Sequence, residues 1–473
     1  MKVIVENLGI LKKAAFDVGN LTIICGANNT GKTYATYALY GFLNYWHEGF
    51  TVNLLTNDAM DTLFEQGSIL IDLNEIYQNA ARILNDACQS YNQHIKRVFA
   101  ASDQYFTNTV FNIFLDKITD HYIHTEKTIA VMGINRKPLF TIHKQRGDAS
   151  AAVSITAEFD EVSGINKKQV SQNISRYILN LLFDEILPVP FIASIERTGA
   201  AMFQNELDII RNRLLEQVGN LKKEMDPLAL IYNYYSRGFA GYALPVKDNV
   251  DFIRNLENLV KQESHLMRDN PDIIALFDTI AGGQYKPFKE GLYYLPHKTK
   301  IKLTMGESAS SVRSLLNLGI YLRHIARPGD MLMIDEPELN LHPLNQRRMA
   351  RLLARLSNAG VYVFITTHSD YIVKEINTLI MLKHLHDTSD SDSERIMQKY
   401  KYHSEELLAP DGIKAYIAKK TIVKTEGYTR KHLINTFVPA PIDAEGIEIP
   451  DFDDPINDMN KMQDEILSGG RRI

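Results

Sequence analysis

The sequence predicts an α/β fold with a doubly wound, mostly parallel sheet, an antiparallel β piece and a large, mainly helical insertion. Continuously apolar runs at residues 21–25, 331–334 and 361–365 are typical of strands buried on both faces, as in parallel sheets. Segments with helical spacing of apolar residues alternate with these runs, which indicates a parallel sheet.

The N-terminal part of the chain reads as three short strands followed by a helix. The strands are expected at residues 2–8, 12–18 and 21–26, with a turn at Gly9. The third strand runs directly into a glycine-containing loop, after which apolar residues recur at helical spacing over residues 32–46.

Two long helical stretches, 73–101 and 205–225, flank a β-hairpin whose strands lie at 128–134 and 138–144, joined through residues 135–137. Strand and helix patterns return after residue 290, with Gly360 closing one helix. The polar stretch at 386–394 reads as a linker. Four parts are therefore expected: 1–73, the first part of the core; 74–290, the helical insertion; 291–385, the second part of the core; and 386–473, a small α/β extension for interactions.

Composition excludes several classes of protein. An apolar fraction of 45% with 23% charged residues is ordinary for a globular chain. The net charge of −5 argues against a uniformly basic nucleic-acid binder but leaves a local basic groove open. Two cysteines, Cys25 and Cys88, cannot build a disulfide framework or a cysteine-rich zinc site. With no signal-peptide pattern and no apolar run of bilayer length, a soluble cytoplasmic protein is expected.

The strongest motif is Gly26–Thr33, a complete G-x-x-x-x-G-K-[ST] between a strand and a helix. Its backbone N–H groups can surround phosphate at the N-terminus of the helix. Lys32 is expected to reach the β- and γ-phosphates and Thr33 to ligate Mg²⁺, so the expected cofactors are ATP and Mg²⁺. The other expected nucleotide contacts are Asn28, Asn29, Thr30, Gly31 and Tyr34.

Two further strand ends carry candidate catalytic groups. Asp335 and Glu336 follow the apolar run 331–334, where open α/β sheets bind ligands. Asp335 is expected to hold Mg²⁺, and Glu336 to orient or deprotonate the attacking water. His368 follows the run 361–365, one helix and one strand later, and is expected to sense or polarise the γ-phosphate; a structural cap is the alternative.

These residues carry a resemblance to a known family. GANNTGKT at 26–33, MIDEPELNLHP at 333–343 and ITTHSD at 365–370 resemble the Walker A, Walker B with D-loop, and switch-histidine segments of ABC-type P-loop ATPases, in the branch with RecF, SMC and OLD-type proteins. The signature segment at 307–315 keeps serines but lacks the usual glycines. It is similar to that of bacterial anti-phage ATPases such as those of PARIS and Septu. The resemblance covers 1–45 and about 290–385.

The resemblance implies a head-to-tail dimer. Ser310 and Ser311 would bind the γ-phosphate held by another subunit. The alternative is that the segment 308–311 merely caps the helix that follows, and both roles can hold together. The segment 339–343 would cross the dimer interface. Glu196 and Arg197 follow another apolar strand and are expected to face the nucleotide or the insertion, with a surface ion pair as the alternative.

OLD-type proteins also carry a TOPRIM nuclease, which needs a strand-end glutamate and an Asp-x-Asp pair. Glu426 and the pair Asp451 and Asp453 are too close in the chain for this domain, so no nuclease activity is expected here. Two functions stay open. One is the sensor or scaffold of an anti-phage complex that controls a separately encoded effector, such as a TOPRIM-like or HNH nuclease, under a phage protein or DNA trigger. The other is a RecF/SMC-like DNA-maintenance ATPase. Neither involves a membrane.

Overall fold

The structure is a computed structural model and describes residues 1–102, 104–115, 121–124, 126–132, 138–156, 167–184, 186–202, 241–288, 291–424 and 431–467. The chain divides into two compact units. The first comprises residues 1–3, 41–94 and 111–189, and the second residues 4–40, 95–110 and 190–473.

A large mixed sheet organises the chain. Within the described residues it has nine strands in the order β5-β1-β2-β15-β14-β3-β13-β12-β9. The strands are β1 (Lys2–Leu8), β2 (Leu11–Asp17), β3 (Leu21–Cys25), β5 (Val110–Phe114), β9 (Pro190–Ala193), β12 (Met331–Asp335), β13 (Tyr362–Thr367), β14 (Ile413–Lys424) and β15 (Lys431–Pro439). The five from β14 to β9 are parallel, and β15 is antiparallel to β14. The predicted α/β class with a mostly parallel core is confirmed.

The sheet curls. Phe16 of β2 lies 5.9 Å from Phe364 of β13 between ring centroids, although three strands separate β2 from β13 in the sheet order. Phe437 of β15 also contacts Phe16, at 5.8 Å. Curling closes one face of the sheet over its own aromatic side chains, which is why apolar residues continue on both faces of the central strands.

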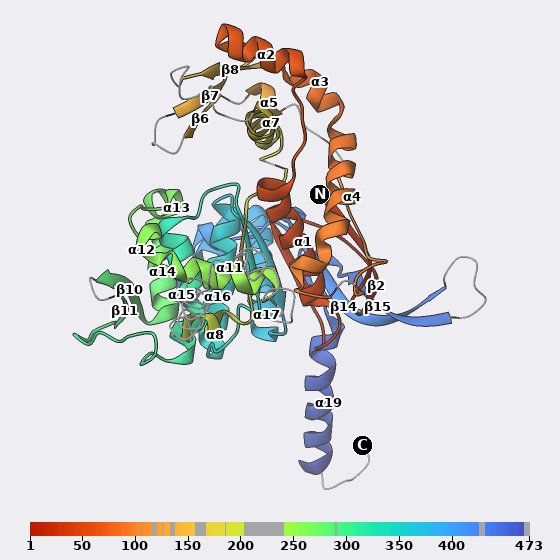
Figure 1. Ribbon diagram of the computed structural model, residues 1–473. Helices are drawn as coiled ribbons and strands as arrows, with labels where there is room; N and C mark the ends of the chain where they lie inside the picture. The colour runs from red at the N-terminus through yellow and green to blue at the C-terminus, as the bar shows by residue number, and fades with distance from the viewer. Residues whose placement is uncertain are drawn as a thin grey trace, which may run out of the picture. The chain divides into compact units, whose positions relative to one another are not determined.

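The other face of the central strands packs on helices of the second unit. Leu21 and Ile23 of β3 align with Val363 and Ile365 of β13, and all four belong to the main buried cluster. Figure 1 shows α14, α15 and α16 side by side. The helices of this unit are α1 (Lys32–Asn44, which runs on into the first unit), α8 (Arg197–Met202), α11 (Leu244–Arg254), α12 (Leu256–Leu259), α13 (His265–Asp269), α14 (Pro271–Ala281), α15 (Ser310–His324), α16 (Pro343–Asn358), α17 (Asp370–Thr388), α18 (Asp390–Tyr400), η2 (Ser404–Glu406), η3 (Pro410–Gly412) and α19 (Pro450–Leu467). Two short ribbons pair β10 (Gly283–Phe288) with β11 (Gly291–Pro296) and β16 (Ile442–Asp443) with β17 (Gly446–Ile447).

The first unit holds a separate antiparallel sheet in the order β4-β8-β7-β6. The predicted hairpin is present: β6 pairs with β7, although its joint at 135–137 lies outside the described residues. The predicted helix at 205–225 also lies outside them. The elements of this unit are η1 (Tyr45–Gly49), α2 (Asn57–Gln66), β4 (Ser68–Asp72), α3 (Leu73–Gln78), α4 (Ala80–Val98, which ends in the second unit), α5 (His121–His124), β6 (Lys127–Met132), β7 (Pro138–Lys144), β8 (Ser150–Ile155) and α7 (Lys167–Phe183).

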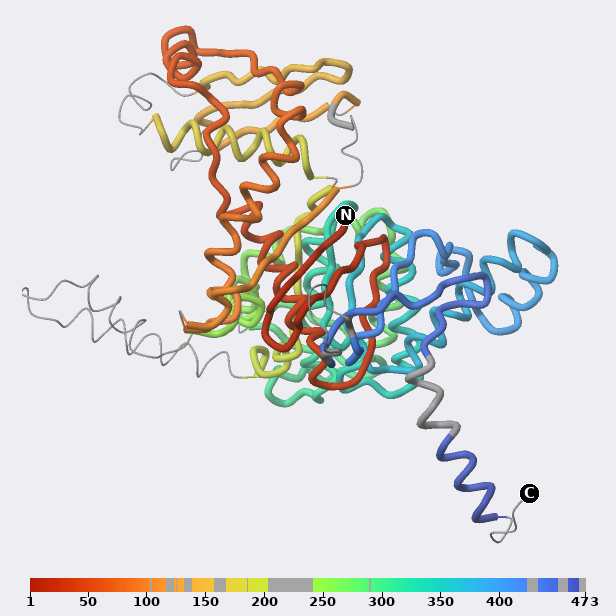
Figure 2. Tube along the Cα trace, turned by 90° about the vertical axis from the view of Figure 1, so that its right-hand side faces the viewer, coloured from red at the N-terminus to blue at the C-terminus, as the bar shows by residue number. Residues whose placement is uncertain are grey.

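The C-terminal part differs from the expectation of a linker and a separate extension. Residues 386–388 end helix α17, residues 390–394 begin helix α18, and Ser389 between them is the capping residue of both helices. Acidic side chains in the first turn of α18, at Asp390 and Asp392, are favourable at the positive end of a helix dipole, so this polar stretch is helical. Figure 2 follows the blue C-terminal strands into the sheet beside the red N-terminal ones, and Ile413 of β14 pairs with Leu21 of β3. The described residues 190–202 and 241–288 belong to the second compact unit, together with β12 and β13, whereas the sequence predicts 74–290 as one insertion.

None of the helices in the described part of the chain combines the length and the apolar character that a bilayer-spanning segment needs.

Candidate nucleotide-binding site

The loop between β3 and α1 has a backbone that requires glycine at two positions. Gly26 has φ 137°, and a Cβ there would press against the carbonyl oxygen of Ala418 in β14. Gly31 has φ 101°, and a Cβ there would lie 2.5 Å from the side chain of Leu11. Asn29, at φ 58°, is exposed with its neighbour Asn28. The loop therefore turns tightly into α1, as anion binding at a helix N-terminus requires.

Lys32 begins α1 and turns back over the loop. Its Nζ donates to the carbonyl oxygens of Gly26 and Ala27, each at 2.9 Å, and the residue is only 6% exposed. Burial lowers the pKa of Lys32, opposed by the charges of Asp335 and Glu336. The loop is further tied by Thr30, whose hydroxyl donates to Ala27 O at 2.8 Å.

Asp335 and Thr33 meet where parallel strands end at the same edge of the sheet. The Thr33 hydroxyl donates to Asp335 Oδ2 at 3.1 Å, and Thr366 of β13 donates to Asp335 Oδ1. Asp335 is 2% exposed, and burial raises its pKa despite these two hydrogen bonds. A hydroxyl beside a carboxylate oxygen is a donor set that suits Mg²⁺.

Glu336 directs its side chain toward His368. Its Oε1 lies 3.4 Å from His368 Nε2, and both side chains are partly exposed. Burial, and then the charge of Lys32, lowers the pKa of His368, so the imidazole is neutral at neutral pH and the contact is not a full ion pair. Glu336 itself has φ 53°, a left-handed conformation that is uncommon outside glycine.

Glu338 is a site residue that the sequence reasoning missed. Its carboxylate accepts from the Thr367 hydroxyl at 2.9 Å and from the backbone N–H of His368 at 2.6 Å, so it holds the histidine segment against the end of β12. Burial raises the pKa of Glu338. The sequence signal that could have indicated Glu338 is its position two residues after Glu336 in the same acidic stretch.

Glu196 and Arg197 have distinct surroundings. Glu196 accepts from the Tyr37 hydroxyl of α1 at 3.0 Å. Arg197 is 3% exposed, and its guanidinium donates to the backbone carbonyls of Asp335 and Glu336, at 2.7 Å each. Arg197 thus lies behind the carboxylate pair instead of forming a surface ion pair, and burial lowers its pKa to about 10.

The serines of the signature segment occupy the first turn of α15. The residue at the helix N-cap is Ala309, with no side-chain hydrogen bond, so the alternative that these serines cap the helix is wrong. Ser310 is exposed and Ser311 partly exposed. Within the described residues, no hydrogen bond joins either serine to the loop 26–33 of the same chain.

The segment 339–343 links β12 to α16. Asn340 has φ 61°, Leu341 is buried, and His342 is the N-cap of α16, accepting from Leu344 N at 3.3 Å. Leu339 O accepts from the Ser314 hydroxyl of α15 at 3.2 Å, which ties this segment to the signature helix.

A cavity of about 330 Å³ adjoins Thr33. It is lined mostly by aromatic side chains: Tyr34, Tyr37, Phe99, Tyr105 and Phe106, with Thr33, Ala101 and Ala243. The rings of Phe99 and Phe106 are stacked with centroids 4.9 Å apart, and Tyr34 lies 5.4 Å from Phe99. Tyr34 had been predicted as a nucleotide contact. Nothing in the sequence indicated Tyr37 of α1 or the rings of the segment 99–106, which has no motif of its own.

Comparison with known proteins shows the family of this chain. Residues 1–373 match the family described as AAA ATPase domain. The chain belongs to this family. No curated protein matches the sequence.

Solved structures similar to this ATPase include heads of SMC proteins. One is an SMC head bound to the C-winged helix domain of ScpA, at 13% identity and TM-score 0.33, covering 93% of this chain and 97% of that one. The SMC head from Thermotoga maritima has 10% identity and TM-score 0.28, covering 93% and 98%. The Pyrococcus furiosus head with an extended coiled coil, bound to the C-terminal domain of ScpA, has 12% identity and TM-score 0.30, covering 98% of each chain. The fold description rests on the strand order given above and not on these superpositions.

The family match ends just after His368, yet the sheet of this ATPase continues through β14, which pairs with β3. The matched residues include the loop 26–33, Asp335, Glu336 and His368. Glu426 lies outside the described residues, as do the side chains of Asp451 and Asp453, so the expectation about a nuclease stays a prediction.

Proposed function

We propose that the chain binds ATP with Mg²⁺ at the loop 26–33 and hydrolyses it. The observation that carries the proposal is the meeting of Thr33 and Asp335 at 3.1 Å, next to a lysine whose Nζ already lies over the loop carbonyls. Thr33 and Asp335 would hold Mg²⁺, which neutralises developing charge on the phosphates when bound. Lys32 would bind the β- and γ-phosphates.

Glu336 is assigned as the residue that orients or deprotonates water, and His368 as the residue that polarises the γ-phosphate. Glu336 Oε1 and His368 Nε2 lie 3.4 Å apart, which supports the idea that both act on the γ-phosphate and its attacking water. The neutral imidazole can donate one hydrogen bond. The aromatic cavity beside Thr33 supports the proposal that the ligand is a nucleotide and not a bare polyphosphate, because nucleobases stack on aromatic rings.

Two copies would complete the site head to tail. Ser310 and Ser311 lie on the first turn of α15 and are at least partly exposed, which supports a role in binding the γ-phosphate held by another copy. Turnover would then open and close an assembly.

The assembly is proposed to act as the sensor or scaffold of an anti-phage complex that controls a separately encoded nuclease or toxin. The support is the serine-led signature segment, which resembles those of anti-phage ATPases. The alternative is a DNA-maintenance ATPase of the RecF/SMC kind. Measuring ATPase rates with duplex DNA and, separately, with phage-infected cell lysate separates the two. Stimulation by DNA alone favours the alternative.

The Glu336→Gln variant tests the assignment of the water-handling residue. It is expected to retain ATP but to turn over roughly 10²–10⁴-fold more slowly, because an amide cannot accept the proton. Asp335→Asn is the matched neighbour and is expected to weaken Mg²⁺-dependent binding instead. Undiminished hydrolysis by Glu336→Gln contradicts the role given to Glu336.

A further inference from the structure

Arg197 donates hydrogen bonds to backbone carbonyls on several segments around the site. It belongs to none of the nucleotide-binding motifs identified in the sequence. It is the first residue of α8, just beyond β9, which is the neighbour of β12 in the sheet. Its side chain is nearly fully buried. A buried guanidinium is costly unless most of its donors are satisfied, so its partners define what it does.

The partners of Arg197 are backbone carbonyls on three segments. Nη1 donates to Ser194 O at 2.8 Å and to Asp335 O at 2.7 Å, and Nη2 donates to Glu336 O at 2.7 Å. Nε donates to Ser314 O on α15 at 2.9 Å. One rigid planar group thus joins the end of β9, the end of β12 and the signature helix.

Glu336 depends on such support because its backbone is strained. A non-glycine residue at φ 53° costs free energy and persists only where its surroundings hold it. Three hydrogen bonds hold the backbone of this residue: Glu336 N donates to Thr366 O at 3.0 Å, and Glu336 O accepts from Leu339 N at 3.1 Å and from Arg197 Nη2 at 2.7 Å. The direction of the Glu336 side chain follows from this backbone conformation.

The contact with Ser314 brings α15 into the same network. Ser314 lies three residues beyond Ser311, and its hydroxyl also donates to Leu339 O in the segment after β12. A displacement of the first turns of α15 therefore acts on the Glu336 backbone through Arg197 and on the segment 339–343 through the Ser314 hydroxyl.

We propose that Arg197 is a positioning residue that couples the signature helix α15 to Glu336. Binding of phosphate at Ser310 and Ser311 is thereby transmitted to the residue that handles water. This inference rests on the proposed role of Glu336. It assigns Arg197 no contact with the nucleotide.

Arginine is required for this coupling because of its shape. The planar fork reaches carbonyls on three segments at fixed angles, whereas a lysine ammonium is a single point with three donors and cannot span them. Arg197→Lys therefore preserves the charge and loses the connection.

Arg323 offers a matched control. It is also a buried arginine of the same core, it lies on α15, and it pairs with Asp278 away from the loop 26–33. Arg197→Lys and Arg323→Lys are compared by fluorescent-ATP binding, kcat, KM and thermal unfolding. The kcat is calculated per ATP-binding site, so partial unfolding of either variant lowers the number of sites and leaves kcat interpretable.

Arg197→Lys is expected to bind ATP and keep its KM while kcat falls roughly 10- to 100-fold, the range typical for residues that support the ligands of a metal site. Arg323→Lys is expected to keep the wild-type kcat. In the double variant Glu336→Gln with Arg197→Lys, kcat is expected to fall no further than in Glu336→Gln alone.

Each other result has a defined meaning. A wild-type kcat in Arg197→Lys, an equal fall in both lysine variants, or an additive loss in the double variant overturns the coupling. If Glu336→Gln alone turns over at the wild-type rate, the proposed role of Glu336 fails first, and that outcome is distinct from a failure of Arg197.

Discussion

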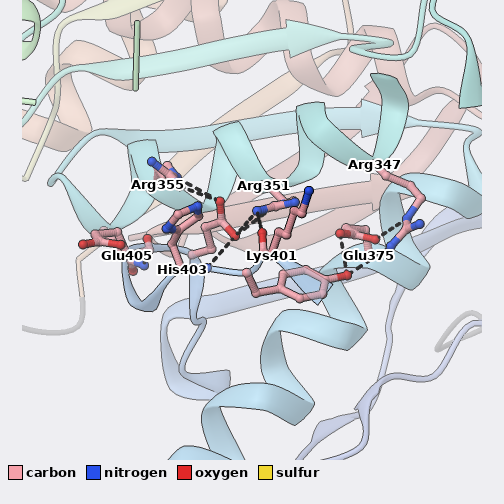
Figure 3. Close-up of polar contacts among 10 residues, drawn as sticks. Arg347, Arg351, Arg355, Glu375, Lys401, His403 and Glu405 are labelled. Atoms are coloured by element: carbon pink, nitrogen blue, oxygen red, sulfur yellow. Dashed lines mark hydrogen bonds and ion pairs between the residues drawn. The ribbon is translucent and has the colours of Figure 1, made fainter. Parts of the chain in front are cut away.

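Replacing Glu406 with glutamine should destabilise the second unit without touching the nucleotide site. Glu406 is fully buried in η2 and accepts hydrogen bonds on both carboxylate oxygens. Arg351 Nε donates to Oε2 at 2.8 Å, and Arg355 donates to Oε1 from Nε at 3.0 Å and from Nη2 at 2.8 Å. Figure 3 shows these arginines directed from α16 toward the segment with His403 and Glu405.

The loss of stability in Glu406→Gln depends on Arg351 and Arg355, which stay charged and partly buried in the variant. A glutamine must place its NH₂ group against an arginine donor, which breaks one side of a buried charge network. Breaking a buried pair costs about 3–5 kcal/mol. The Arg351 and Arg355 side chains are 18% and 10% exposed, so they can be partly rehydrated, and the lower end of this range applies. About 3 kcal/mol corresponds to a fall in Tm of roughly 4 °C for a unit of this size.

The assay is thermal and urea unfolding, with Glu405→Gln as the control. Glu405 is the neighbouring residue of η2 and is exposed, so its substitution should leave Tm unchanged. ATP binding should survive in both variants at a temperature below the transition. Equal unfolding curves for Glu406→Gln and Glu405→Gln would refute the reasoning that the buried carboxylate ties α16 to η2.

Two further predictions concern the site itself. Phe106→Ala should raise the Kd for ATP about 5- to 150-fold, because stacking contributes roughly 1–3 kcal/mol per base, while the Kd for inorganic tripolyphosphate stays unchanged. Phe288→Ala, a phenylalanine outside the cavity, is the control, and an equal loss for both ligands would argue against a base at this position. Burial lowers the pKa of His368 in the folded protein, so as the pH falls below about 6.5 the unfolded chain takes up a proton first. The nucleotide-free protein should therefore lose stability relative to His368→Asn between roughly pH 7 and 5, which unfolding at each pH measures, and a constant difference would contradict the lowered pKa.

Local chemistry explains what could be predicted from the sequence. Gly26 and Gly31 occupy backbone conformations that the motif requires, and both also lie where a side chain would meet another segment. Asp335 comes directly after four apolar residues, so its place at the carboxyl ends of the parallel strands follows from the strand pattern. The turn and strand signals needed for these predictions all lie within about ten residues of the site residue they position.

Long-range contacts explain what the sequence left open. Arg197 reaches Asp335 across 138 positions in the chain, and Phe106 approaches Tyr34 only because the loop after α4 returns to α1. The polar residues 386–394 read as a linker in the sequence because polarity is common to loops and to exposed helix faces.

The sequence by itself determined the phosphate-binding loop, the carboxylate pair and the parallel core, since each depends on a short pattern. Only the tertiary structure decided that β14 completes the sheet beside β3, that aromatic rings border Thr33, and that Arg197 supports Glu336. These features depend on which distant segments pair, and neither apolar periodicity nor local motif spacing specifies that choice.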